Sequence, residues 1–156
     1  MTLLNMPAFA DEVFSLYLVR HAEKQASKDN PALTACGRLR AQQLATLLEK
    51  AEIKAIYSTQ YQRTLATAKP LSQQQTLAIK HYSPSGLEQF ALQLKQHQQN
   101  ALVVGHSNTT PMLAELLSGQ GVAAISEQQY QNLYQIQFSN NKTTLTQFKQ
   151  PLLCRT

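Results

Sequence analysis

Two histidines in this chain each follow an apolar run that is typical of a buried strand. The first run, residues 16–19, is followed by Arg20 and His21, and the second, residues 101–104, ends just before His106. Open α/β sheets carry their chemistry at the carboxyl ends of parallel strands, so we expect both imidazoles at one edge of a sheet. Because the two histidines lie far apart in the chain, neither belongs to a local metal motif.

Two arginines accompany these histidines. Arg20 directly precedes the first one, and Arg63 lies near the start of a predicted helix that follows a short strand. Guanidinium groups bind phosphate in a bidentate manner, and helix N-termini favour anions. Together, the two arginines and two histidines predict an oxyanion pocket suited to phosphate.

The elements that must position these residues alternate between strand and helix. A first helix is predicted after an N-cap at Thr34. A second helix carries Arg63, and Pro70 is expected to kink or end it. Another helix is predicted after Thr110-Pro111, which resembles an N-cap followed by proline at the first helical position. A further helix is predicted over 86–99, strands over 13–20, 55–57 and 101–104, and a closing hairpin over 133–138 and 143–148, joined by Asn140-Asn141.

This order predicts an α/β fold, a three-layer α/β/α sandwich. Its sheet is expected to be mostly parallel, with an antiparallel edge formed by the C-terminal hairpin. The chain has 156 residues, a length that fits a single domain over residues 13–156. No stretch approaches the roughly 20 apolar residues of a membrane helix, so no membrane span is predicted.

The charge distribution favours small anionic ligands. The net charge is +5, from 14 lysines and arginines against 9 acidic residues, and the basic residues are scattered. A mild preference for anions follows, whereas a nucleic-acid partner is not predicted. Arg38 and Arg40, in the first turn of the first helix, are expected on its solvated face.

The N-terminus and the cysteines bear on location. Residues 1–12 read as a leader or as the remnant of a signal peptide, because Ala8-Phe9-Ala10 resembles a signal-peptidase site although no basic segment precedes it. The remnant would place the protein in the periplasm or outside the cell, and a simple leader in the cytoplasm. In an exported protein Cys36 and Cys154 could pair and tie the C-terminal tail to the first helix, but two unrelated cysteines are the favoured interpretation.

Four motifs in order resemble the histidine phosphatase superfamily, also called the phosphoglycerate mutase-like family, in a short single-domain form. The resemblance covers about residues 14–118 and implies the phosphoglycerate mutase-like version of the sandwich. The motifs are Val19-Arg20-His21-Ala22-Glu23-Lys24, Leu33-Thr34-Ala35-Cys36-Gly37, Tyr57-Ser58-Thr59-Gln60-Tyr61-Gln62-Arg63-Thr64 and Val104-Gly105-His106-Ser107-Asn108-Thr109.

The resemblance implies a phosphatase that needs neither metal nor cofactor. His21 would attack phosphorus and form a phosphohistidine, which water then hydrolyses. Arg20, Arg63 and His106 would hold the non-bridging oxygens of a phosphomonoester or phosphoramidate. Asn108 would either add a hydrogen bond to the substrate or simply cap the helix that follows.

The general acid of the family has no clear counterpart in this chain. Ser107-Asn108 stands where one branch of the family has an aspartate. Mutase-like members use a glutamate from the region between the second helix and the next, where this chain offers Glu88, although a solvated first-turn carboxylate is the plainer interpretation. Glu23 is closer to His21 in sequence. A third possibility is that no dedicated acid exists, which would suit phosphoramidates.

A core without insertions predicts an open pocket, and therefore a phosphatase for a phosphorylated small molecule or a phosphoprotein. The alternative is a non-catalytic module that only binds phosphate, and a true phosphoglycerate mutase is the third interpretation. The sequence does not predict the physiological substrate or the oligomeric state.

Overall fold

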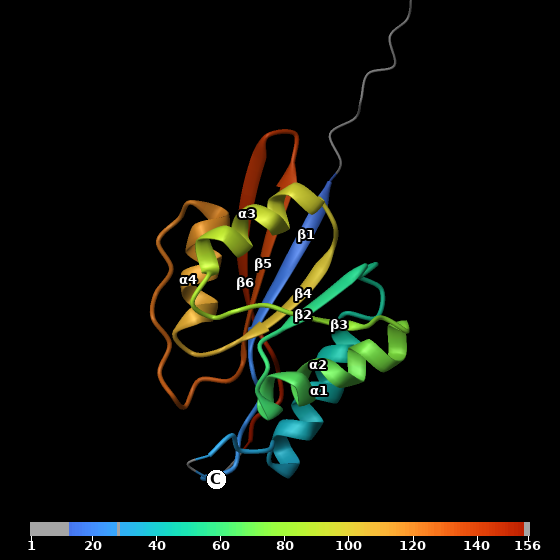
Figure 1. The fold of residues 1–156 in the computed structure, drawn as a ribbon, viewed down its shortest axis with the longest axis vertical. Coiled ribbons are helices and arrows are strands. Elements are labelled where there is room, and N and C mark those ends of the chain that lie inside the picture. Colours follow the sequence, from blue (N-terminus) through green and yellow to red (C-terminus); the bar gives the residue numbers. More distant parts are fainter. Residues whose placement is uncertain (1–12, 28, 155–156) are drawn as a thin grey trace, which may run out of the picture.

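The computed structural model describes residues 13–27 and 29–154 (Figure 1). The predicted leader, residues 1–12, lies outside the described residues. The elements are β1 (Phe14–Arg20), α1 (Ala35–Leu47), β2 (Ala55–Ser58), α2 (Gln62–Gln75), β3 (Ile79–His81), α3 (Leu87–His97), β4 (Ala101–Gly105), α4 (Thr109–Ser118), β5 (Asn132–Ser139) and β6 (Lys142–Lys149). No helix in this part of the chain is long and apolar enough to cross a membrane.

The six strands form one sheet in the order β3-β2-β4-β1-β5-β6. The first four are parallel, and β5 and β6 add the antiparallel edge that the sequence predicts. The turn between β5 and β6 consists of Asn140 and Asn141, whose φ angles of 48° and 62° suit a tight hairpin. In the register of the parallel strands, Arg20 pairs with Gly105 and Ser58 with Val104, so the carboxyl ends of β1, β2 and β4 meet at one edge.

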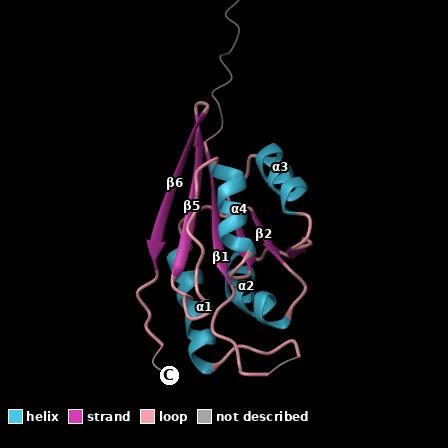
Figure 2. Cartoon of the chain, turned by 90° about the vertical axis from the view of Figure 1, so that its left-hand side faces the viewer, coloured by secondary structure: helices cyan, strands magenta, loops and turns pink. Residues whose placement is uncertain are grey.

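Helices cover both faces of the sheet, as expected of a three-layer sandwich (Figure 2). One core cluster joins β1 to α3 and α4 and includes Leu18, Leu94 and Leu113. The other joins the opposite face to α1 and α2 and includes Val19 and Leu44. Successive residues of a strand point to opposite faces, and β1 is buried along nearly its whole length because helices cover both of its sides.

The start of α1 is fixed against the loop that follows β1. The hydroxyl of Thr34 accepts a hydrogen bond from the backbone N–H of Gly37 at 3.0 Å, which confirms the predicted N-cap. The backbone N–H of Thr34 donates to the carbonyl of Glu23 at 2.9 Å. A Cβ atom at position 37 would collide with that same carbonyl, so only glycine allows the helix to approach this closely.

Three details of the elements differ from the sequence predictions. Pro70 does not end α2, which continues to Gln75; the proline removes one hydrogen bond, and the buried side chains on both sides, such as Thr67 and Leu71, keep the helix packed. The strand β3 was not predicted, because it has only three residues and none is fully buried. Helix α4 starts at Thr109, so Thr110 is not its N-cap, and Asn108 holds that position.

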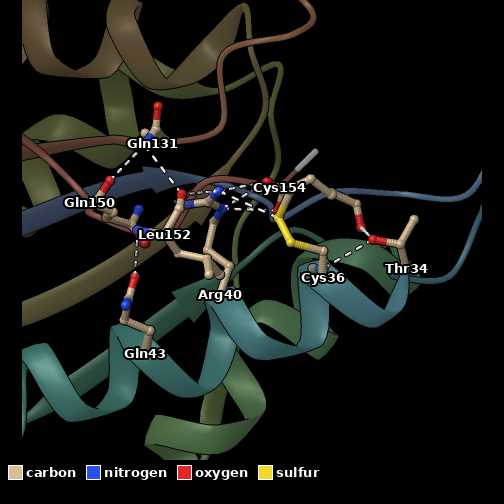
Figure 3. The surroundings of a disulfide bond; sticks show 10 residues. Thr34, Cys36, Arg40, Gln43, Gln131, Gln150, Leu152 and Cys154 are labelled. Carbon is tan, nitrogen blue, oxygen red and sulfur yellow. Dashed lines mark hydrogen bonds and ion pairs between the residues drawn. A yellow bond between two sulfur atoms is a disulfide. The ribbon is translucent and has the colours of Figure 1, made fainter. Parts of the chain in front are cut away.

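A disulfide bond joins Cys36 in α1 to Cys154 in the C-terminal tail (Figure 3). The interpretation as two unrelated cysteines is therefore wrong. The two Cα atoms lie 5.9 Å apart, because the tail folds back from β6 onto α1. Gln131 holds the tail in place, since its side-chain amide donates to the carbonyls of Gln150 at 2.8 Å and Leu152 at 3.2 Å.

Arg40 is buried beneath this tail instead of lying on a solvated face, so that expectation is also wrong. Its Nη2 lies 2.6 Å from Oε1 of Glu23, and its Nε lies 3.0 Å and 2.9 Å from the two oxygens of the same carboxylate. Nη2 also donates to the carbonyl of Leu152 at 2.9 Å. The carboxylate and the tail replace much of the water that the guanidinium loses on burial, although its Nη1 has no hydrogen-bond partner among the described residues.

Candidate active site

The neighbouring strands β1 and β4 bring His21 and His106 together at the same edge of the sheet. The ring centroids lie 5.7 Å apart, with an angle of 67° between the ring planes. The backbone N–H of His21 donates to the carbonyl of Gly105 at 2.9 Å, which extends the parallel ladder up to the histidine itself. The parallel register explains how two residues so distant in sequence reach one site.

His21 is buried and oriented by its own backbone neighbour. Its Nδ1 lies 2.8 Å from the carbonyl oxygen of Ala22, which can only accept a hydrogen bond, so Nδ1 carries the proton. Desolvation and the positive charges of Arg20 and Arg63 lower the pKa of His21 to about 3, although the bond to Ala22 opposes this shift. The ring is therefore neutral at neutral pH, and its Nε2 carries a lone pair.

His106 is oriented by a chain of hydroxyl groups. The Thr59 hydroxyl donates to the Thr64 hydroxyl at 3.0 Å, so it accepts from Nε2 of His106 at 2.9 Å. Nδ1 of His106 then faces Nη2 of Arg63 at 3.5 Å. Burial, followed by the charges of Arg63 and Arg20, lowers the pKa of His106 to about 4. Both imidazoles are neutral before any anion binds.

Arg20 lies at the base of the site, where it holds the irregular segment before β5. Its Nη1 donates to the backbone carbonyls of Glu127 at 2.8 Å and Gln129 at 3.1 Å. Its Nη2 forms an ion pair with Oε2 of Glu127 at 3.0 Å, and its Cζ lies 3.9 Å from the centre of the Tyr130 ring. The Nε atom has no hydrogen-bond partner among the described residues.

Both histidines, Arg63 and Glu127 line a cavity of about 420 Å³ at the edge of the sheet, whereas Arg20 is not among its lining residues and touches it through Glu127. The Nε atom of Arg63, like that of Arg20, is buried without a hydrogen-bond partner in the described part of the chain. Two arginines with buried, unused Nε donors, and only one carboxylate among the described lining residues, make a site in which an anion would satisfy donors that are otherwise unpaired. The lining residues are His21, Lys24, Tyr61, Arg63, Pro84, Ser85, His106, Ser107, Asn108, Thr109 and Glu127.

Glu127 is the residue of this site that the sequence reasoning missed. Its carboxylate lies between Arg20 and the hydroxyl of Ser107, which donates to Oε1 at 2.6 Å. It comes from the segment between α4 and β5, which has no helix, strand or motif that would mark it. The one available signal was that few carboxylates exist in the chain, which has nine acidic residues in all.

The three tentative site residues lie in different places. Glu23, although only two residues from His21, turns toward Arg40 and does not line the cavity. Glu88 is exposed at the start of α3 and lines a separate groove of about 830 Å³ between α3 and α4. Asn108 lines the cavity and occupies the N-cap position of α4, but its side chain makes no capping hydrogen bond.

One group of possible metal ligands is found among the described residues. It consists of Glu23, Cys36 and Cys154, whose ligand atoms all lie within 4.8 Å of one another. The two sulfur atoms are joined in the disulfide, and the carboxylate is paired with Arg40. None of the three lines the cavity that holds the histidines.

Comparison with known families identifies the architecture of this site. The model of the histidine phosphatase superfamily (branch 1) matches residues 16–83, which span β1 to the residues just after β3 and contain Arg20, His21 and Arg63. This part of the chain is similar to the histidine phosphatase superfamily. None of the curated proteins compared with this chain matches it in sequence.

Solved structures extend the likeness over most of the chain. The alpha-ribazole phosphatase from Shigella flexneri is 20% identical and has a TM-score of 0.70. The match covers 91% of this chain and 99% of the phosphatase chain. The mycobacterial glucosyl-3-phosphoglycerate phosphatase is 12% identical, with a TM-score of 0.70 and coverages of 88% and 98%. The protein histidine phosphatase SixA, solved with tungstate, is 15% identical with a TM-score of 0.69, and the match covers 86% of this chain and 96% of SixA. Identities this low establish a common fold, and with the family match they support a phosphatase.

Proposed function

We propose that this protein is a metal-independent phosphatase that hydrolyses a phosphomonoester or phosphoramidate through a phosphohistidine on His21. The observation that carries the proposal is the state of His21: a neutral ring whose Nδ1 is held by the Ala22 carbonyl, beside arginine donors that lack partners. A ring of this kind has the lone pair of a nucleophile. The arginines supply positive charge that is fixed before the reaction starts.

In the first step, Nε2 of His21 attacks phosphorus in line with the leaving group. The N–P bond forms, and the bond between phosphorus and the leaving atom breaks with its electron pair on that atom. Arg20 and Arg63 bind the non-bridging oxygens, and the phosphate charge favours a proton on Nδ1 of His106, which then also donates to an oxygen. The bond from Nδ1 of His21 to Ala22 stabilises the imidazolium character that develops.

In the second step, water attacks the phosphohistidine and the N–P bond returns its electron pair to Nε2. The cavity contains exposed residues, including Asn108 and Glu127, so water has access to the intermediate. A phosphate acceptor other than water would make the protein a mutase. The open cavity favours hydrolysis, because nothing described encloses a second substrate.

Proteins with the same fold support a phosphorylated substrate of modest size. The mycobacterial phosphatase has been solved with inorganic phosphate, and the phosphoserine phosphatase of Entamoeba histolytica with 3-phosphoglyceric acid and, as a mutant, with phosphoserine. We propose that this chain takes a phosphorylated small molecule or an exposed phosphoryl group on a protein. The cavity of about 420 Å³ has room for a phosphoryl group and a small leaving group.

Hydrolysis of p-nitrophenyl phosphate in the presence of EDTA tests the proposal. We expect turnover by the wild-type protein and by His97→Ala, which removes an exposed histidine of α3, and a loss of at least about 10³-fold in His21→Ala. Binding of tungstate to His21→Ala would show that the pocket is still folded. Turnover that depends on a metal, or that survives in His21→Ala, would contradict the proposal, and binding without turnover by the wild type would indicate a phosphate-binding module.

We also propose that the protein works in an oxidising compartment such as the periplasm. The disulfide between Cys36 and Cys154 supports this, because disulfides persist mainly outside the reducing cytoplasm. Thiol labelling of the protein in cell extracts prepared at low pH should find both cysteines blocked. Two reactive thiols in such an extract would contradict this location.

A further inference from the structure

We propose that Glu127 is the proton donor to the leaving group, and that substrate activates it by displacing its carboxylate from Arg20 and Ser107. This inference rests on the proposed function and assigns the acid that the sequence motifs leave open. Glu127 is at neither of the two positions, Glu23 and Glu88, where the motifs suggest an acid. It comes from the segment between α4 and β5.

The first support is the place of the carboxylate. One oxygen of Glu127 accepts from Nη2 of Arg20 at 3.0 Å and the other accepts from the hydroxyl of Ser107 at 2.6 Å. Glu127 and Ser107 line the same cavity as His21 and His106. The carboxylate is thus an internal anion bound to donors that a phosphoryl group entering this cavity would use.

The second support is the unused edge of Arg20. Its Nη1 is committed to backbone carbonyls, while Nε has no partner among the described residues and Nη2 holds Glu127. Nε and Nη2 form one side of the guanidinium, and that side binds an oxyanion through two parallel hydrogen bonds. A phosphoryl group can use this side fully only when Glu127 gives up its place on Nη2.

The third support is that Glu127 can move. Its side chain is 67% exposed, whereas that of Arg20 is 2% exposed. An ion pair with one hydrated partner contributes little free energy, so a phosphoryl dianion can replace the carboxylate at small cost. In the proposal the displaced carboxylate remains within reach of the leaving group, because Glu127 lines the same cavity as His21.

The exchange also supplies the proton. In the free protein the hydrogen bond from Ser107 and then the charge of Arg20 hold the pKa of Glu127 below its usual value. Substrate removes both contacts and places a phosphoryl dianion beside the carboxylate, and each change raises that pKa. The charged or titratable groups that face Glu127 are Arg20 of β1, His21 and Lys24 of the following loop, Arg63 of α2, His106 after β4 and Tyr130 before β5.

The proton and electron pairs balance over the cycle. Protonated Glu127 gives its proton to the leaving oxygen as the P–O bond breaks and the N–P bond to His21 forms, so an alcohol leaves and a carboxylate remains. That carboxylate then takes a proton from the water that attacks phosphorus, while the N–P bond returns its electron pair to His21. No other carboxylate lines the cavity within the described part of the chain.

Glu127→Gln tests the assignment with two substrates, one whose leaving group needs a proton and one whose leaving group does not. For an alkyl phosphate, whose leaving oxygen needs a proton, we expect kcat to fall by about 10² to 10⁴-fold. For p-nitrophenyl phosphate, whose leaving group departs as an anion, we expect a change of less than about tenfold. Inorganic phosphate should inhibit Glu127→Gln more strongly than wild type, because a neutral amide competes less for Arg20.

The matched control is Glu88→Gln, which removes an exposed carboxylate that lines the other groove. It should leave both substrates and the inhibition by phosphate unchanged. Equal losses on the two substrates in Glu127→Gln, or a loss restricted to the alkyl phosphate in Glu88→Gln, would overturn the assignment. A wild-type protein without any phosphohistidine would instead overturn the proposed function, so the two failures are distinguishable.

Discussion

Two buried arginines in this protein pair with glutamates, and the two pairs behave oppositely. Arg40 and Glu23 lie under the C-terminal tail, with side chains 3% and 14% exposed. In the other pair Glu127 lines the cavity and Arg20 lies behind it, with side chains 67% and 2% exposed. The arginines are equally buried, so the difference rests with the carboxylates.

That difference decides which pair can open. Glu23 binds Arg40 through both oxygens and has little access to water, so separating the two would leave two charges buried without partners. Glu127 is mostly hydrated and binds Arg20 through a single oxygen, so water or a phosphoryl group can replace either partner. An arginine–glutamate pair therefore stabilises the fold beneath the C-terminal tail, whereas the pair beside the cavity can exchange its carboxylate for a ligand.

The largest effect is expected from breaking the closed pair. Arg40→Met should lower the free energy of unfolding by about 3–5 kcal/mol, because it leaves the Glu23 carboxylate buried without a partner. Urea unfolding of wild type and variant measures this loss. The double variant Arg40→Met/Glu23→Met should recover most of it, and a double variant as unstable as the single one would contradict this account.

Removing the other arginine should affect activity more than stability. Arg20→Met is expected to lower kcat/KM by about 10² to 10³-fold, the cost of one preorganised oxyanion donor. Its free energy of unfolding should fall by less than that of Arg40→Met, since Glu127 remains hydrated. If Arg20→Met unfolds as readily as Arg40→Met while keeping its activity, the comparison between the two pairs fails.

The most gradual effect, spread over the range between pH 6.5 and pH 4, is the pH dependence of stability at the cavity. His21 and His106 have pKa values of about 3 and about 4 in the folded protein, below the ordinary value of 6.5. As the pH falls below 6.5, both histidines bind protons in the unfolded chain but not in the folded protein. The free energy of unfolding therefore decreases toward pH 4, by at most about 1.4 kcal/mol per pH unit for each histidine. Well above pH 6.5 both states are neutral and these groups contribute no pH dependence.

Urea unfolding at several pH values between these limits measures this slope. His106→Gln should be less sensitive to acid than wild type, and His97→Gln, which changes an exposed histidine, should not differ from it. An identical slope in wild type and His106→Gln would show that His106 is not held neutral by burial.

The sequence predicted the parts of the site that sit on regular elements. Arg20, His21 and His106 lie at the ends of mainly apolar strands. Because β1 and β4 pair in parallel, these ends lie at the same edge of the sheet. The hairpin was equally predictable, because two adjacent asparagines tolerate the left-handed backbone that its turn requires.

Features that depend on packing between distant segments were not predictable. Glu127 reaches Arg20 from an irregular segment, and Cys36 reaches Cys154 across 118 residues. Arg40 looked like an ordinary surface residue, because the tail that buries it returns only after β6. Helix α2 passes Pro70 since burial on both sides outweighs one lost hydrogen bond.

The most direct test of the central claim is to trap the intermediate. Protein mixed with a ³²P-labelled substrate and quenched in alkali, where phosphohistidine survives, should carry label on the peptide that contains His21. The label should be stable to alkali, labile to acid and missing from His21→Ala. Rapid turnover without any labelled peptide, or label that persists in His21→Ala, would contradict the claim that His21 is the nucleophile.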